Sequence, residues 1–268
     1  MYLRKIDADT TINIDLLVLG SSHAYRGFDP RIFKKAGIKL FNLGSSGQTP
    51  LQSKFLLKRY TEQFNPKLVI IEVYPIALET TGLGPFIDLI SNFKVTNSMY
   101  SNAIKINHIE AWNSLILAQM YDLLTARPDV QQSFKRNDDI YIQGGFVEKN
   151  SPALLDFSEN VIEQECHPTE TNWVALINCV NYCKAKAVPV LLVQTPISPK
   201  SYSNIDNTLA LDSSFISLRP DFYLNANKEN LKIEPNYFYD SHHLSIEGVS
   251  WFNDWFIMQL SENKMLAN

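Results

Sequence analysis

Short runs of mostly apolar residues alternate with helix-like stretches over the first quarter of the chain. The runs cover residues 15–19, 38–42 and 68–73, and each is followed by a loop that contains Gly, Ser or Pro. Runs of this length are typical of strands buried on both faces of a sheet. Residues 51–64 carry apolar side chains at helical spacing, and Asp29 precedes a Pro at the start of a shorter helix. Short connections between such elements predict a parallel sheet with right-handed crossovers.

The regular alternation lapses between about residues 76 and 165 and then returns. Within this stretch, residues 104–126 have the spacing of one long helix or two, with Ile109, Trp112, Leu115, Ile116 and Met120 as the apolar stripe. We expect a mainly helical insertion or cap over the carboxyl edge of the sheet, with a structural helical layer as the alternative. The remaining elements expected are a hairpin over 139–147, a helix over 169–186, strands over 188–194 and 221–224, and a closing helix over 246–262.

Length and charge limit the class of protein. The 268 residues can form one large α/β domain with an insertion, residues 1–268, and the formal net charge is only −4. No run of Lys or Arg indicates a nucleic-acid or anionic-membrane partner, and no segment reaches membrane-spanning length. The first residues lack the apolar core of a signal peptide. We therefore expect a cytoplasmic protein, or a cell-envelope protein if an N-terminal anchor has been removed.

The cysteines and two of the histidines are not candidates for a functional site. The cysteine count is odd, with Cys166, Cys179 and Cys183, which argues against a disulfide framework. Cys179 and Cys183 are four residues apart, and we interpret them as small buried apolar residues rather than a metal or redox pair. His108 and His167 are interpreted as surface or core residues without a functional role.

The first candidate for chemistry is the turn that follows the first predicted strand. Gly20-Ser21-Ser22-His23 ends an apolar strand, and the Gly allows a sharp turn without a Cβ penalty. A serine on such a turn is exposed at the carboxyl end of a parallel sheet, where open α/β sheets place their ligands. The alternative is an ordinary strand–turn–helix connection with a serine N-cap.

The second candidate lies just before the closing helix. Asp240 precedes His243 by three residues, with Ser241 and His242 between them. An Asp at this spacing can place its carboxylate against the imidazole, fix its tautomer and stabilise its protonated form. A serine hydroxyl is a weak nucleophile without such a base, so the two segments complement each other.

In this order, the segments resemble those of the SGNH (GDSL-type) hydrolase superfamily. The resemblance covers residues 15–73 and 169–262. It implies Ser22 as the nucleophile, in a Gly-Ser-Ser-His sequence where the family has Gly-Asp-Ser. It also implies that Asp240 and His243 complete a catalytic triad, and the Leu-Ser that follows them fits the common form of the family's fifth block.

The resemblance also implies an oxyanion hole, with one departure. Residues 46–49, Ser-Gly-Gln-Thr, are similar to the family's second block, so the N–H groups of Gly47 and Ser22 are the expected donors, with Gly44 as the second choice. After the third strand the family has Gly-x-Asn-Asp, whose Asn also donates. Residues 72–75 are instead Glu-Val-Tyr-Pro. Losing one such donor costs about 3–4 kcal/mol of transition-state stabilisation.

Further side chains are expected near this site. His23 and Tyr74 are the nearest candidates by sequence to replace the missing Asn, and Glu72 and His242 are candidate pocket residues. A metal site is an alternative, since His23 and the Asp240 segment with its two histidines could converge and bind zinc or another divalent ion. The chain lacks the fixed helical His spacing that would support that interpretation.

These observations predict an α/β fold of flavodoxin-like, three-layer type, with a parallel sheet of about five strands and a mainly helical insertion. The resemblance implies a serine hydrolase or acyltransferase that acts on an O-acylated carbohydrate or another small ester through an acyl-serine intermediate. No metal and no organic cofactor is expected. The alternative is a catalytically impaired carbohydrate-binding or scaffold domain of the same fold, because the third-block Asn is absent.

Overall fold

The computed structural model describes residues 1–125, 133–153, 163–228 and 231–266. Its centre is a sheet of five parallel strands in the order β2-β1-β3-β7-β8, which confirms the predicted fold class. The register pairs Leu17 of β1 with Phe41 of β2 and Val69 of β3. The strands are β1 (Leu16–Leu19), β2 (Leu40–Asn42), β3 (Leu68–Glu72), β7 (Val190–Gln194) and β8 (Phe222–Asn225).

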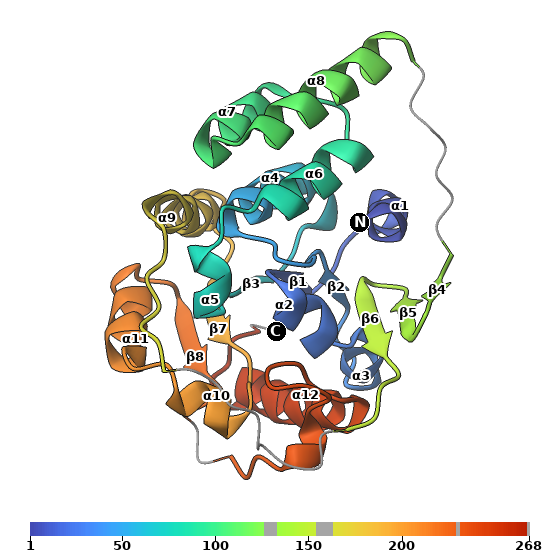
Figure 1. The fold of residues 1–268 in the computed structure, drawn as a ribbon. Helices are drawn as coiled ribbons and strands as arrows, with labels where there is room; N and C mark the ends of the chain where they lie inside the picture. The colour runs from blue at the N-terminus through green and yellow to red at the C-terminus, as the bar shows by residue number, and fades with distance from the viewer. Residues whose placement is uncertain (126–132, 154–162, 229–230, 267–268) are drawn as a thin grey trace.

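Helices cover both faces of this sheet, because side chains alternate between the faces along each buried strand (Figure 1). Leu17 and Leu19 belong to the cluster formed with α4 (Pro50–Phe64) and α9 (Glu170–Ala185). Leu16 and Val18 belong to the other cluster. That cluster also contains residues of α3 (Pro30–Lys35) and α12 (Ile246–Glu262), and the short helix α2 (Ser22–Gly27) lies on the same face.

The predicted helices start where their capping residues allow. Asp29 accepts a hydrogen bond from Arg31 N at the start of α3, and α4 begins with a capping box between Thr49 and Gln52. The cysteines are buried as predicted: Cys179 and Cys183 are free thiols on the face of α9 that packs in the core. Burial raises the pKa of the Cys183 thiol to about 12, which keeps it neutral and unreactive.

The stretch between β3 and α9 contains both helices and a second sheet. The stretch predicted over 104–126 as one long helix or two belongs to two, α7 and α8, because Asn107 adopts a left-handed conformation with φ 49° and ends the first. The expected insertion or cap over the sheet edge stays a prediction. The elements here are α5 (Pro75–Glu79), α6 (Leu83–Asn92), α7 (Asn97–Ile106), α8 (Ile109–Leu123), and the antiparallel strands β4 (Lys135–Arg136), β5 (Asp139–Ile142) and β6 (Phe146–Lys149).

The apolar stripe predicted for α8 was wrong at most positions. Ile109, Ile116 and Met120 are 67%, 55% and 52% exposed, whereas Ala111, Leu115 and Ala118 are buried. The reason is tertiary: α8 packs against α6 and α7 at the periphery of the molecule, so the face that carries Ala111, Leu115 and Ala118 makes the contact (Figure 1). The last residue of the segment predicted over 104–126 lies outside the described residues.

Four further short elements carry no strong periodicity and were not predicted. Arg4 and Asp7, both on the N-terminal helix, form hydrogen bonds with the turn between β5 and β6. No helix among the described residues is long and apolar enough to cross a membrane. The four elements are α1 (Tyr2–Thr10), α10 (Pro199–Ser203), α11 (Thr208–Ser217) and the 3-10 turn η1 (Pro235–Tyr237).

Candidate active site

The turn after β1 places Ser22 at the first position of α2. Gly20 has φ 145°, and a Cβ there would lie 2.6 Å from Glu72 Cβ, so only Gly fits this close approach. Ser21 is the N-cap, and its side chain accepts a hydrogen bond from His23 N. Ser22 therefore lies where the backbone N–H groups of a helix N-terminus are unpaired within the helix and favour developing negative charge.

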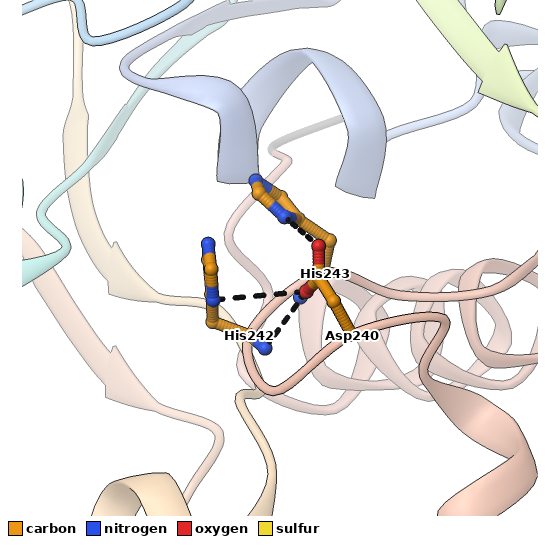
Figure 2. A group of neighbouring side chains, drawn as sticks. All are labelled: Asp240, His242 and His243. Atoms are coloured by element: carbon orange, nitrogen blue, oxygen red, sulfur yellow. Dashed lines mark hydrogen bonds and ion pairs between the residues drawn. The ribbon is translucent and has the colours of Figure 1, made fainter. Parts of the chain in front are cut away.

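The structure brings Ser22, His243 and Asp240 together in one hydrogen-bonded line. Ser22 Oγ lies 2.8 Å from His243 Nε2, and His243 Nδ1 lies 2.8 Å from Asp240 Oδ2. The other carboxylate oxygen, Oδ1, accepts hydrogen bonds from the backbone N–H groups of His242 and His243, at 3.0 and 2.7 Å (Figure 2). Residues 221 positions apart in the sequence meet at the carboxyl edge of the sheet.

The charge of Asp240 is stabilised by these contacts. Partial burial acts to raise the pKa of its carboxyl group, but hydrogen bonds and charge from His243, with help from the backbone N–H of His242, outweigh it and lower the pKa. Asp240 is therefore ionised at neutral pH. Its carboxylate fixes the proton of His243 on Nδ1, which leaves Nε2 to accept the Ser22 proton.

The loop that carries His243 is fixed on both sides. The carbonyl oxygen of Ser241 accepts hydrogen bonds from Ser198 N at 3.1 Å and Ser201 Oγ at 2.9 Å, both in the segment that follows β7. Ser245, the N-cap of α12, donates its backbone N–H to Tyr237 O at 2.8 Å. Helix packing and the β7 loop therefore determine the position of the imidazole.

Aromatic rings surround His243. His23 is buried, with its ring centroid 5.0 Å from that of His243 and 4.0 Å from that of Tyr74. Burial, and then the neighbouring His243 and His242, hold the pKa of His23 well below its usual range, so this ring is neutral. The His242 ring packs against the rings of His23 and His243. Tyr239, which the sequence did not indicate, is stacked on His243 with ring centroids 5.5 Å apart. The rings limit how His243 can rotate.

Glu72, at the end of β3, contacts the turn formed by residues 20–22. Its Oε2 accepts hydrogen bonds from Ser21 N at 2.9 Å and Ser21 Oγ at 2.7 Å, and its Oε1 accepts one from Tyr74 N at 2.5 Å. The side chain is 4% exposed, and burial raises its pKa to about 7 despite these donors. Glu72, expected as a pocket residue, is thus directed into the turn beneath Ser22.

The second-block loop packs on the same turn. Gly44 donates its N–H to Asn42 Oδ1 at 2.9 Å, so it cannot serve as the second choice of oxyanion donor without losing that bond. Its lack of a side chain has another use: a Cβ there would lie 2.8 Å from Ala24 Cβ, against α2. Ser45 N donates to Gly20 O at 3.1 Å, and Gly47 follows in a left-handed turn with φ 61°. Gly47 remains the candidate donor from this loop.

No Asn follows β3, and the backbone there is already hydrogen-bonded. Val73 N donates to Val193 O at 2.9 Å, and Tyr74 N donates to the Glu72 carboxylate. Neither N–H is therefore available to a developing oxyanion. The Tyr74 ring lies against His23, and burial raises the pKa of its hydroxyl, which keeps it a neutral donor group.

A metal site is geometrically conceivable at Asp240, His242 and His243. Each can offer one ligand atom, and these atoms lie within 4.8 Å of one another (Figure 2). Both ring nitrogens of His243 are, however, engaged, by Asp240 and by Ser22. Binding a metal through His243 would require the loss of one of these hydrogen bonds. His23, the fourth ligand of the metal hypothesis, does not belong to this group of atoms.

The remaining histidines lie in other surroundings. His108 is the N-cap of α8, where its Nδ1 accepts a hydrogen bond from Glu110 N at 3.2 Å. His167 has a side chain that is 73% exposed, and its Nε2 lies 3.1 Å from Glu165. Both positions agree with the prediction of structural or surface roles.

Comparison with known proteins gives distant structural likenesses. No protein-family model matches the sequence, and no curated protein sequence matches it. Among solved structures, the chain is similar to a GDSL-like lipase from Bacteroides thetaiotaomicron, with 13% identity, a TM-score of 0.44, and coverage of 97% of this chain and 95% of that one. It is also similar to a family 3 carbohydrate esterase from Clostridium thermocellum, with 11% identity, a TM-score of 0.43, and coverage of 96% and 100%.

Proposed function

We propose that the protein is a serine hydrolase or acyltransferase of the SGNH type, with Ser22, His243 and Asp240 as its catalytic triad. The observation that supports this most strongly is the line of two 2.8 Å hydrogen bonds from Asp240 through His243 to Ser22. Ser22 Oγ attacks the acyl carbon while His243 Nε2 takes its proton, and His243 then returns that proton to the leaving alcohol. Water or a second alcohol attacks the acyl-serine with His243 again as base, which releases the acid or a new ester.

The proposed oxyanion hole consists of the backbone N–H groups of Ser22 and Gly47. Ser22 contributes through its place at the N-terminus of α2, and Gly47 through the loop that packs on the nucleophile turn. With the third-block Asn absent, we expect weak turnover of unactivated esters, since one missing donor costs about 3–4 kcal/mol. Turnover of activated esters depends less on the oxyanion hole because their leaving groups are already stable.

The substrate class that we propose is an O-acylated carbohydrate or another small ester, without a metal or organic cofactor. The rings of His23 and His242 lie beside that of His243, Tyr74 lies against His23, and all three are proposed to shape the pocket. A second candidate function is a catalytically impaired glycan-binding or scaffold domain of the same fold. The observation that favours it is the lack of a third oxyanion donor where β3 ends.

The test is to react the protein with a fluorophosphonate probe, map the labelled residue, and measure turnover of p-nitrophenyl acetate. We expect labelling at Ser22 alone, and Ser22→Ala should abolish turnover while the fold is kept, because the change leaves no cavity. Ser213→Ala, an exposed serine on α11, is the matched control and should behave as wild type. Equal turnover by wild type and Ser22→Ala would remove Ser22 as nucleophile and favour the binding-domain alternative.

A further inference from the structure

A second concave site lies on the side of α4 that faces away from the sheet. It is a pocket of about 690 Å³ between α4, the connection from α6 to α7, α7 itself and α1. This volume lies within the range of small-molecule sites. None of its residues belongs to the Ser22 site. The lining residues are Lys5, Leu51, Lys54, Phe55, Lys58, Arg59, Phe93, Lys94, Thr96, Ser98, Ser101, Asn102 and Lys105.

The charge of this pocket is entirely positive. Six of its thirteen lining residues are Lys or Arg and none is Asp or Glu, in a chain whose net charge is −4. Within the described part of the chain, Lys5 alone among the six lies within ion-pair distance of a carboxylate, at 2.7 Å from Asp9. The other cations, from three separate segments, face the same hollow without a neutralising partner there.

These cations are close enough to repel one another. The pKa of Lys54 is lowered, first by partial burial and then by the positive charges of Lys105 and Lys58. Lys54 and Lys58 belong to α4, whereas Lys105 belongs to α7, so the repulsion acts across the pocket. A bound anion would reduce this repulsion. Without one, the repulsion between the lysines lowers the stability of the folded protein.

The interior of the pocket is apolar and aromatic. Phe55 and Phe93 are in edge-to-face contact with centroids 5.4 Å apart, and Leu51 lies beside them on α4. The hydroxyl groups of Thr96 and Ser98, 2.9 Å apart and hydrogen-bonded to each other, line the α7 side, which leaves one hydroxyl proton to donate to a ligand. Lysine and arginine side chains together with an aromatic surface favour a ligand that carries negatively charged groups on an organic skeleton.

We infer that this pocket binds a small organic molecule that carries two or more anionic groups, such as phosphate, sulfate or carboxylate. Several Lys side chains bind such groups as movable point charges, and the Phe55–Phe93 pair contacts the body between them. The site is separate from the proposed catalytic site, so it stands even if Ser22 is not a nucleophile.

The test is calorimetric titration of the full chain at an ionic strength of about 0.02 M, where surface charges are weakly screened. The probes are glucose 1,6-bisphosphate, citrate and a disulfated disaccharide, with glucose as the neutral comparison. We expect one-to-one saturable binding of at least one anionic probe and none of glucose. The preferred probe identifies the anionic group, and affinity should fall about tenfold or more in about 0.2 M salt.

Charge-reversal variants locate the binding. Lys54→Glu and Lys105→Glu should each weaken binding about tenfold or more, whereas Lys35→Glu, an exposed lysine on α3 outside the pocket, should change it less than about twofold. Lys54→Gln should not lower the thermal midpoint, because it removes repulsion. Absence of saturable binding by every anionic probe, or equal weakening by Lys35→Glu, would overturn the inference.

Discussion

At the residue scale, Glu72 is the group that most directly links the end of β3 to the candidate nucleophile. It accepts hydrogen bonds from both the N–H and the hydroxyl of Ser21, the residue before Ser22, and from Tyr74 N. An ionised carboxylate holds three donors more firmly than a neutral acid does. We therefore expect Glu72 to position Ser22 through Ser21 rather than to act as an acid or base itself.

The raised pKa of Glu72 makes a prediction about stability and pH. Its pKa rises from 4.5 to about 7 on folding, so between these values the folded state holds a proton that the unfolded state has lost. The free energy of unfolding must then fall as pH rises through this window, by about 3 kcal/mol from this group. Glu72→Gln should remove that decline. Urea unfolding of wild type and Glu72→Gln at pH 4.5, 6 and 8 measures the free energy of unfolding. The same dependence on pH in both proteins would contradict the prediction.

Asp240 makes a second residue-scale prediction. Asp240→Asn should lower kcat on p-nitrophenyl acetate by roughly 10²–10⁴-fold, because the amide can no longer hold the His243 proton on Nδ1. The folded structure should persist, since an amide of the same size still accepts at one oxygen. Stopped-flow turnover with a circular-dichroism control measures this. Unchanged kcat would exclude the triad even if Ser22 is labelled.

At the element scale, two loops meet because two helices begin at the same sheet edge. α2 begins at Ser22 beside β1, and α12 begins directly after the loop that carries His243. Asn253 of α12 donates to Gly27 O at 2.6 Å and accepts from Asp29 N at 2.9 Å, which joins the two helices at the other end of α2. The distance between Ser22 and His243 therefore depends on how α12 packs.

Gly248 tests this dependence. A Cβ at Gly248 would lie 2.0 Å from Tyr237 O, so Gly248→Ala must move either α12 or the backbone of η1. We expect a loss of about 1–3 kcal/mol in stability and a fall of roughly 10-fold or more in kcat, because small displacements of catalytic groups are costly. Ser250→Ala, an exposed position on the same helix, is the matched control. Wild-type kinetics in Gly248→Ala would show that the helix start does not position His243.

At the scale of the whole molecule, the N-terminal helix α1 connects the main sheet to the small one. Arg4 is buried and donates two hydrogen bonds to Gly145 O, at 3.2 and 2.8 Å, and Asp7 accepts from Gly144 N and from Tyr141 Oη. The small sheet is joined to α2 as well, through the paired contacts of Arg26 with Asp139. The small sheet is thus held by α1 and, separately, by α2.

Arg4→Met should weaken this attachment. The variant leaves Gly145 O without its donor in a buried position, and we expect a loss of about 1–3 kcal/mol in the free energy of unfolding. Lys5→Met on the same helix removes the exposed pair with Asp9 and the contact of the ammonium with the Phe93 ring, and should cost less than about 1 kcal/mol. Hydrogen exchange should quicken in β5 and β6 of Arg4→Met alone. Equal exchange in both variants would argue against the attachment.

Local sequence signals determined the strands, most helix starts and the residues that meet at the site. Branched apolar runs indicate buried strands, and Asp29, Thr49 and Ser245 each mark a helix start by side-chain capping, which needs no distant partner. The Gly20 turn and the Asp240–His243 spacing are local in the same way. Their convergence at one edge was implied by the resemblance to the SGNH hydrolases, and neither segment shows it alone.

Only the tertiary structure decided which side chains face one another across elements. The link from Glu72 to Ser21 spans 51 residues, and the bond from Gly44 N to Asn42 removes one candidate donor. The α8 stripe failed because periodicity predicts that a face is buried without saying which neighbour covers it. The cationic pocket combines residues of α1, α4 and α7 that form no run in the sequence. Its charge is unbalanced only because folding places lysines from distant segments together without acidic partners.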